Sequence, residues 1–246
     1  MRVALVSDVH GNLQALDAAL QHARGEGIDA VWCMGDMVGY GAQPNEVIAR
    51  LREVDARCVI GNHDAAALGL IGTELFNPTA AVSADWTKDS LLPESREFLA
   101  AKAETEEDGD WTFVHGTFGD PLWEYLTHES NARSHFDAAR SRLSLVGHTH
   151  LQLVVWRDSE GRIGERQPTG GEVVELNTWD GHQICVNPGG VGQPRDGDPR
   201  APYAILDTAT NEVRFHRVSY AVEEAQRHIR EAGLPGVLAD RLEEGR

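Results

Sequence analysis

The chain has 246 residues, 41% of them hydrophobic, which is enough to bury the core of one large domain. Its 22 Lys and Arg residues against 39 Asp and Glu residues give a net charge of −17. Such a chain repels a nucleic-acid backbone at long range, so non-specific nucleic-acid binding is not expected. A small phosphorylated substrate is still compatible with this charge, because bound metal ions reverse the local field.

The three cysteines are scattered in apolar surroundings, at Cys33, Cys58 and Cys185. An odd, sparse set argues against a disulfide framework and against a thiolate zinc site, so we expect buried, reduced thiols. Met1 leads directly into an apolar strand without a cleavage site, and no apolar run approaches the ~20 residues of a membrane span. We therefore expect a cytoplasmic protein without a membrane segment.

Apolar runs alternate with helical patterns over the first 60 residues. Short runs typical of strands buried on both faces occupy residues 3–6, 30–34 and 57–60. A helix is predicted after Asn12, a suitable N-cap, and glycine ends it at Gly25. A second helix is predicted from Pro44 to Arg52. This alternation favours parallel strands covered by helices.

The remainder of the chain is less regular. Residues 65–108 are rich in Ala and Leu and end in an acidic stretch, so we predict two or three helices that form a cap-like insert. The polar, Gly-rich residues 158–171 are expected to be an exposed connection, and residues 221–246 a helix broken near Pro235. No linker stands out, which favours a single domain over residues 1–246. Further strands are predicted at 111–114, 143–146, 151–156, 172–176, 183–186, 203–207 and 212–217.

Polar side chains follow the predicted buried strands at the point where each strand ends. The carboxyl ends of parallel strands share one edge of a sheet, so these groups should meet in space. Imidazoles suit transition metals, and buried carboxylates beside them need cations to offset their charge. The pattern predicts a metal site. Its candidate residues are Asp8, His10, Asp36, Asn62, His63, His115, His148 and His150.

Five short motifs carry these residues, in an order and with gaps that resemble the calcineurin-like metallophosphoesterases. The resemblance extends from residue 6 to about residue 207, and it implies an α/β fold, a four-layer αββα sandwich of two mixed sheets flanked by helices. The motifs are Asp8-Val9-His10, Gly35-Asp36, Gly61-Asn62-His63-Asp64, His115-Gly116 and Gly147-His148-Thr149-His150.

The resemblance implies two divalent transition-metal ions per chain, such as Mn, Fe, Ni or Zn, and in-line attack on phosphorus by a hydroxide that bridges them. His63 would be the general acid that protonates the leaving oxygen, since imidazole titrates near working pH. A plain alternative is that His63 only orients Asn62 by a hydrogen bond. The ligand roles that the resemblance implies are Asp8, His10 and His150 on the first ion, Asn62, His115 and His148 on the second, and Asp36 on both.

The segment after the bridging aspartate bears on the substrate. Phosphoprotein phosphatases and symmetrical diadenosine tetraphosphatases carry an arginine there that grips phosphate, whereas this chain has Tyr40. A phenol cannot make a bidentate charged contact with phosphate. The segment 38–46 and the Gly-rich loop 187–196 resemble instead the small prokaryotic phosphodiesterase branch, although Gly190 stands where that branch usually has Ser.

Candidate substrate contacts are Arg195, in this Gly-rich loop, and Tyr40. Arg195 would reach the substrate phosphate, or it would form a salt bridge with Asp196 or Asp198. An aromatic pocket for a nucleobase or aryl leaving group is a further possibility, although an aromatic cluster more often belongs to a core. The aromatic candidates are Phe76, Trp86, Phe118, Trp123 and Tyr125.

Three functions compete on this evidence. The leading one is a metal-dependent phosphodiesterase that acts on a small phosphate ester. The second is a phosphatase for a nucleotide polyphosphate or a phosphoprotein, against which Tyr40 counts. The third is a non-catalytic scaffold of the same fold, which should lack a ligand or the acid histidine, whereas this chain has all of them. The physiological substrate, the native metal and the oligomeric state are not predicted.

Overall fold

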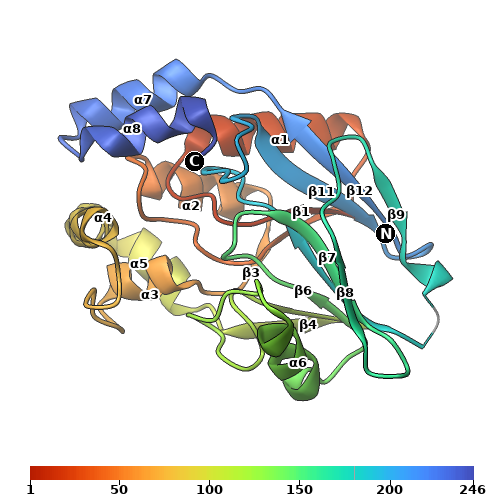
Figure 1. Cartoon of the computed structure of the whole chain (residues 1–246). Coiled ribbons are helices and arrows are strands. Elements are labelled where there is room, and N and C mark those ends of the chain that lie inside the picture. Colours follow the sequence, from red (N-terminus) through yellow and green to blue (C-terminus); the bar gives the residue numbers. More distant parts are fainter. Residues whose placement is uncertain (180) are drawn as a thin grey trace.

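Two six-stranded sheets lie face to face between helices in the computed structural model, which describes residues 1–179 and 181–246. Helix α1 covers the outer side of one sheet and helix α6 the outer side of the other, so the molecule has four layers (Figure 1). The first sheet contains, in spatial order, β3 (Arg57–Cys58), β2 (Ala30–Cys33), β1 (Arg2–Val6), β11 (Ala201–Asp207), β12 (Glu212–Val218) and β9 (Val173–Glu175). The second contains β4 (Thr105–Asp108), β5 (Trp111–Val114), β6 (Leu143–Leu145), β10 (Gln183–Pro188), β7 (Gln152–Arg157) and β8 (Ile163–Arg166).

Both sheets are mixed. In the first, β1 is parallel to β2 and antiparallel to β11, and in the second, β6 is parallel to β5 and β10 whereas β7 is antiparallel to β10. The predicted αββα sandwich with mixed sheets is therefore confirmed. The helices are α1 (Leu13–Gly25), α2 (Pro44–Glu53), α3 (Asn62–Leu68), α4 (Pro78–Ser90), α5 (Pro93–Ala100), α6 (Glu129–Ala138), α7 (Val222–Glu231), α8 (Gly236–Glu244) and a 3₁₀ turn at Leu176–Thr178.

Strand β1 shows why the first elements form as predicted. Ala4 and Val6 pack with α1 and α2 on one side of the sheet, while Val3 and Leu5 pack between the two sheets. Both faces of the strand are thus buried, which is what its unbroken apolar run indicates. Helix α1 begins after Asn12, whose side chain accepts a hydrogen bond from the Ala15 amide.

After residue 100, two strands and one α-helix among the described residues were not predicted as such. The acidic stretch at the end of the expected helical insert is strand β4, which pairs with β5 at the edge of the second sheet. Residues 158–171, expected to be an exposed connection, contain edge strand β8. Helix α6 was not predicted at all. Edge elements have one solvated face and few apolar residues, so they lack the hydrophobic runs that reveal buried strands.

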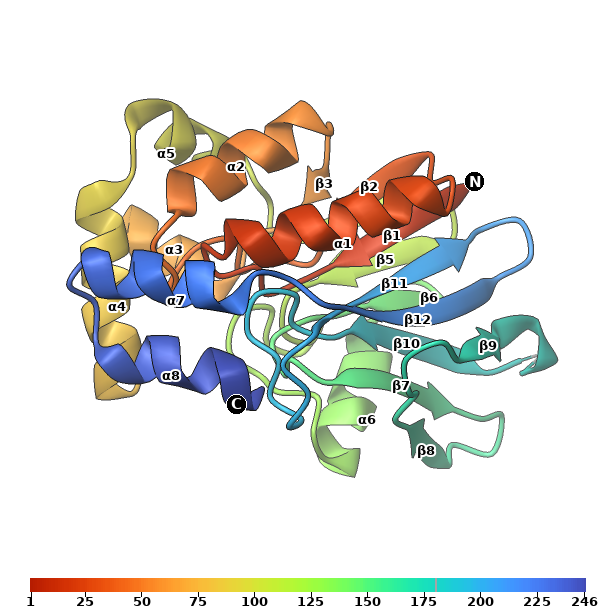
Figure 2. The same ribbon diagram turned by 90° about the horizontal axis from the view of Figure 1, so that it is seen from above.

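Helices gather at one end of the sheets, where the carboxyl end of β1 lies. Figures 1 and 2 agree that α3, α4, α7 and α8 lie at this end and the N-terminus at the opposite end. Cys33, Cys58 and Cys185 are buried free thiols, as predicted. In the part of the chain that the structure describes, none of the helices has the length and apolar character that crossing a bilayer requires.

Candidate metal centre

The seven predicted ligands meet at the strand ends, where the two sheets adjoin. Five loops or helix starts deliver them, each directly after a strand of the central layers. All seven side chains are buried, with at most 4% of their surface exposed. The ligands are Asp8 and His10 after β1, Asp36 after β2, Asn62 after β3, His115 after β5, and His148 and His150 after β6.

The backbone at these strand ends is strained. Positive φ angles in the left-handed region are uncommon for residues with a side chain, and they cluster at functional sites. Eight such residues occur among those that the structure describes, and six of them belong to this one place. The conformation turns the chain sharply off each strand, so that the side chain points inward. The six are Asp8, His10, Asp36, Tyr40, His148 and His150, with φ between 49° and 64°.

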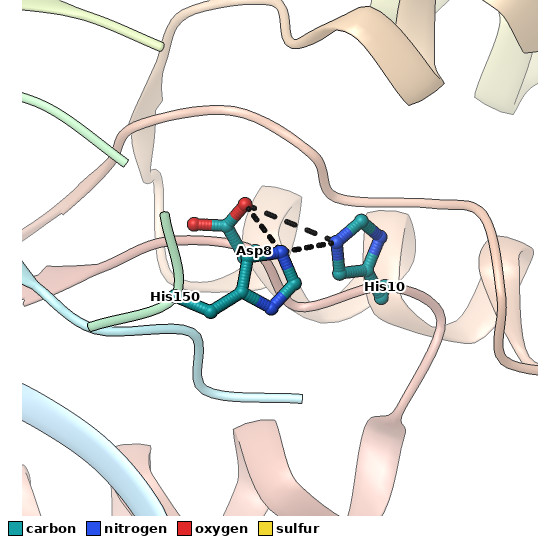
Figure 3. A group of neighbouring side chains, drawn as sticks. All are labelled: Asp8, His10 and His150. Atoms are coloured by element: carbon teal, nitrogen blue, oxygen red, sulfur yellow. Dashed lines mark hydrogen bonds and ion pairs between the residues drawn. The ribbon is translucent and has the colours of Figure 1, made fainter. Parts of the chain in front are cut away.

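Asp8, His10 and His150 form the first cluster (Figure 3). The Nε2 atoms of the two imidazoles are 3.2 Å apart. Asp8 Oδ1 lies 3.2 Å from Nε2 of His150 and 3.8 Å from Nε2 of His10. This carboxylate oxygen is buried and has no hydrogen-bond donor. The three groups therefore point their ligand atoms at a common position.

The other nitrogen of each imidazole defines the chemistry of this cluster. Nδ1 of His10 lies 3.0 Å from the carbonyl oxygen of Val38, and Nδ1 of His150 hydrogen-bonds the carbonyl of Gln193. A carbonyl only accepts, so each Nδ1 carries the hydrogen and each Nε2 of a neutral ring carries a lone pair. Two lone pairs that face each other at 3.2 Å repel unless a cation lies between them. The residues present thus fit a metal ion.

The second cluster repeats this arrangement with Asp36, Asn62, His115 and His148. Nε2 of His115 is 3.0 Å from Nδ1 of His148 and 3.2 Å from the amide oxygen of Asn62. Asp36 Oδ2 lies 3.3 Å from the same Nε2. An imidazole pair, an amide oxygen and a carboxylate oxygen are a donor set suited to a divalent transition metal.

Backbone carbonyls again hold the outer nitrogens. Nδ1 of His115 lies 2.8 Å from the carbonyl oxygen of Met34, and Nε2 of His148 lies 3.3 Å from that of Trp123. When both rings are neutral, the two facing nitrogens are therefore the ones that carry lone pairs, as in the first cluster. Carbonyl partners of this kind are the usual way in which a protein orients metal-binding histidines.

Asp36 connects the two clusters. Its Oδ2 reaches His115 in the second cluster and lies 3.7 Å from Nε2 of His10 in the first. Its Oδ1 accepts a hydrogen bond of 2.9 Å from the backbone amide of His63. Gly61 permits this position, because a Cβ there would lie 2.1 Å from Asp36 Oδ1.

Burial and charge act in opposite directions on the titratable groups. Burial raises the pKa of Asp36, but the nearby His115 and His63 outweigh it and hold the pKa of this carboxyl well below its usual value. Burial lowers the pKa of His115, but the charge of Asp36 outweighs it and raises that pKa to about 9. Burial lowers the pKa of His148 to about 3. Without a cation, a proton on His115 therefore balances the charge of Asp36, and a bound metal ion would replace that proton.

His63 lies on the cavity wall among rings. Its ring centroid is 4.5 Å from that of Tyr40, 4.7 Å from that of Phe76 and 4.9 Å from that of His10. Its Nδ1 is buried and has no hydrogen-bond partner, so no side-chain hydrogen bond to Asn62 is made through it. Burial lowers the pKa of His63 to about 4. Ligand atoms of His63, His10 and Asp36 also lie within 4.8 Å of one another, so distance alone permits a ligand role.

A cavity of about 160 Å³ opens onto both clusters. Tyr40 and Arg195, the two candidate substrate contacts, both line it. The expected alternative for Arg195 is not what the structure has, because Asp196 pairs with Arg217 and Asp198 with Arg200. Arg195 makes one hydrogen bond, to the side chain of Gln193, and its Nε is buried without a partner.

Three of the five aromatic candidates line the cavity, namely Phe76, Trp123 and Tyr125. The Tyr125 ring stacks on the imidazole ring of His148, a candidate metal ligand, with centroids 3.8 Å apart and planes at 17°. The other two were wrong as pocket residues. Trp86 packs against the C-terminal helices, and Phe118 packs with the core beneath α6.

Some residues that support the site were not predicted. Ser7 donates a hydrogen bond of 2.6 Å to Asp8 Oδ2. Asp64 is buried and accepts from the amides of Gly61 and Val38, each at 3.0 Å, which fixes the start of α3. Ser7 stands next to the first motif and Asp64 ends the third, and these positions were the signal available in the sequence.

Comparisons with known proteins agree with this geometry. Residues 1–211 match the calcineurin-like phosphoesterase superfamily domain. An uncharacterised protein of Methanocaldococcus jannaschii is 33% identical over 251 residues, which cover 99% of this chain and 98% of that protein. A crystal structure of a metallophosphoesterase from Sphaerobacter thermophilus is 41% identical with a TM-score of 0.89, and the match covers 100% of this chain and 99% of that one.

A hypothetical protein from Pyrococcus horikoshii shares the fold at 20% identity, with a TM-score of 0.79 and coverage of 100% of this chain and 98% of that one. The expected resemblance is thus confirmed, and the superfamily is one of phosphoric ester hydrolases that use divalent metals. The paired imidazoles, the buried carboxylates and the match over 211 residues lead to one conclusion: the chain belongs to the calcineurin-like phosphoesterase superfamily.

Proposed function

We propose that the protein is a phosphodiesterase with two divalent transition-metal ions, Mn, Fe, Ni or Zn. The observation that carries the proposal is the pair of imidazole–imidazole contacts, at 3.2 Å and 3.0 Å, with Asp36 reaching both. Each contact leaves two lone pairs facing one position, so each fits one ion. A carboxylate with two oxygens can serve two ions at once.

The ligand sets follow from the clusters. Asp8, His10 and His150 would hold the first ion, and Asn62, His115 and His148 the second, with Asp36 shared. Bound ions would polarise the phosphoryl oxygens and lower the pKa of the attacking water.

The chain's own residues supply the remaining chemistry. His63 faces the cavity and would give a proton to the leaving oxygen, which raises the rate most for poor leaving groups. Arg195 and Tyr40 would contact the phosphate or its substituent. The wall formed by Phe76, Trp123 and Tyr125 would accept an aryl or nucleobase group by stacking.

Two features favour a diester over a phosphoprotein or nucleotide polyphosphate. Tyr40 occupies the place of the phosphate-gripping arginine and is 94% buried, so it offers no charge to a terminal phosphate. The aromatic wall beside the metal clusters suits a substituent on the phosphate. A scaffold role would not need four outer imidazole nitrogens all held by backbone carbonyls.

The test is metal analysis combined with hydrolysis assays. Purified protein repleted with Mn, Ni, Fe or Zn should contain close to two ions per chain and hydrolyse bis(p-nitrophenyl) phosphate faster than p-nitrophenyl phosphate. The Asp36→Asn variant should lose an ion and about 10⁴-fold in kcat/KM, because the shared carboxylate is removed. Asp110→Asn, an exposed residue of the same type, is the matched control.

Three outcomes would contradict the proposal. Protein that binds no ion after repletion would refute the site. A preference for monoesters or dinucleoside polyphosphates in the same assays would favour the phosphatase alternative. Full metal occupancy without hydrolysis of any phosphate ester would favour a scaffold.

A further inference from the structure

Two arginines near the cavity, Arg195 on its wall and Arg241 behind Tyr40, have no Asp or Glu partner among the described residues. Arg195 lies in the loop after β10, and Arg241 lies on α8, beyond the 211 residues that match the superfamily domain. Nε of Arg195 is buried and unpartnered, and Arg241 donates through Nε to the carbonyl of Arg246. Neither forms an ion pair within the part of the chain that is described, although the chain has 39 acidic residues.

Tyr40 brings the two guanidinium groups to one place. Tyr40 and Arg195 line the same cavity, and the guanidinium carbon of Arg241 lies 5.8 Å from the centroid of the Tyr40 ring. The Tyr40 ring also contacts His63. Arg195 therefore lines the cavity beside the metal clusters, and Arg241 lies against the Tyr40 ring.

The C-terminal end of α8 holds the Arg195 loop in position. The amide of Gly197 donates a hydrogen bond of 2.9 Å to the carbonyl of Gly245. A Cβ at Gly245 would lie 2.6 Å from the backbone of Asp198, so the two segments are in close contact. Arg195 and Arg241 thus stand on elements that are tied together, and their spacing is built into the fold.

Two cations held close together without an acidic side chain between them destabilise the protein that bears them. Burial and the charge of Arg195 both lower the pKa of Arg241, which shows that the two charges act on one another. The nearest acidic residues of the loop do not relieve this, because Asp196 and Asp198 are engaged by Arg217 and Arg200. An anion bound between them would gain from both, and guanidinium groups suit phosphate.

We propose that Arg195 and Arg241 form an anion subsite beside the metal clusters, which holds a second phosphate group of the substrate. The inference rests on the proposed function, in which the metal clusters take the scissile phosphate. It assigns the substrate to a class: phosphodiesters that carry a further phosphate group, either across a sugar or in anhydride linkage. It also gives the C-terminal helix a part in substrate selection.

The test is calorimetric binding of three probes to the metal-loaded protein. Thymidine 5′-monophosphate has one phosphate, thymidine 5′-diphosphate has a second in anhydride linkage, and thymidine 3′,5′-bisphosphate has a second across the sugar. At least one doubly phosphorylated probe should bind about 10-fold more tightly than the monophosphate, consistent with one charge-assisted contact. The doubly phosphorylated probe that binds more tightly shows which of the two linkages the subsite accepts.

Variants show whether Arg195 and Arg241 provide the tighter binding of the doubly phosphorylated probe. Arg241→Gln and Arg195→Gln should each remove most of it, Arg241→Lys should keep part of it, and Arg52→Gln, an equal change of charge on exposed α2, should keep all of it. Arg195→Gln serves as the independent variant where Arg241→Gln lowers the melting temperature.

Equal affinities for all three probes in the wild type would overturn the subsite. So would a gain that survives both glutamine variants, or an equal loss for all probes in both. Turnover of bis(p-nitrophenyl) phosphate, which has no second anion, reports on the proposed function separately.

Discussion

The two sheets contribute different chemistry to the same centre. The first sheet and its loops supply both carboxylates, the amide of Asn62, and two histidines, His10 and His63. The second sheet supplies imidazoles alone, from His115, His148 and His150. One half of the centre therefore carries the negative charge, and the other carries imidazoles.

This difference indicates how the centre depends on the packing of the sheets. Each cluster combines a carboxylate from the first sheet with an imidazole from the second, so neither sheet could form one alone. Segments of the two sheets are in close contact at Gly147, where a Cβ would lie 2.0 Å from Ser7 Oγ and 3.0 Å from the carbonyl oxygen of Met34. A cation in each cluster would hold the two halves together.

Among the tests that compare the two halves of the centre, the largest effect is expected at His63. His63→Ala should lower kcat about 10³-fold for an alkyl leaving group and much less for p-nitrophenolate, because a good leaving group needs no proton. Metal content should stay unchanged. Kinetics with a series of leaving groups and metal analysis check this, with exposed His128→Ala as the control. Loss of an ion would instead make His63 a ligand, and equal losses for all leaving groups would remove its acid role.

A substitution that forces the two sheets apart should have the next largest effect. Gly147→Ala places a methyl group against Ser7 and Asp8, so we expect a loss of about 10²-fold in kcat/KM and weaker binding of both ions. Gly236→Ala is the matched control, since a Cβ there meets nothing within 4 Å. Unchanged metal affinity in Gly147→Ala would show that the centre tolerates a wider gap between the sheets.

Acid should affect the imidazole-rich half through His135, which joins α6 to the second sheet. Burial lowers its pKa to about 3; its Nδ1 accepts from the Phe118 amide at 3.3 Å, and its Nε2 lies 2.9 Å from Ser144 Oγ. A histidine with a depressed folded-state pKa stabilises the fold above its unfolded pKa of 6.5 and loses this contribution as pH falls. At pH 5 the loss amounts to about 2 kcal/mol, or 1.5 pKa units.

Urea unfolding of the metal-free protein at pH 7.5 and pH 5 measures this loss. His135→Gln, which cannot be protonated, should lose about 2 kcal/mol less between the two pH values than the wild type. Equal losses would mean that other groups control the acid sensitivity.

The smallest effect is expected at the wall of the cavity, where Tyr125 lies over His148 of the imidazole-rich half. Tyr125 is 44% exposed and stacks on His148, so Tyr125→Ala should raise KM for an aryl phosphodiester about 10-fold. Tyr125→Phe keeps the ring and should behave as the wild type. Steady-state kinetics decide, and a fall in kcat at constant KM would make Tyr125 a support for His148 and not a substrate contact.

Elements that depend on a few neighbouring residues could be predicted from the amino-acid sequence. The apolar run of β1, the cap at Asn12 and the break near Pro235 each depend on a few neighbouring residues, and each element formed as predicted. The convergence of the candidate ligands could also be predicted, because each follows a buried strand and these strands end at the same place.

The other features of the fold and of the site depend on contacts between distant segments, which local sequence patterns do not report. Arg241 meets Tyr40 across 200 residues of chain, and the tautomers of four histidines depend on carbonyls from other elements. Strands β4 and β8 form because a neighbouring strand offers hydrogen bonds, and not because their own residues are apolar. Local patterns report burial and helix formation, whereas contacts between distant segments exist only after the sheets have packed.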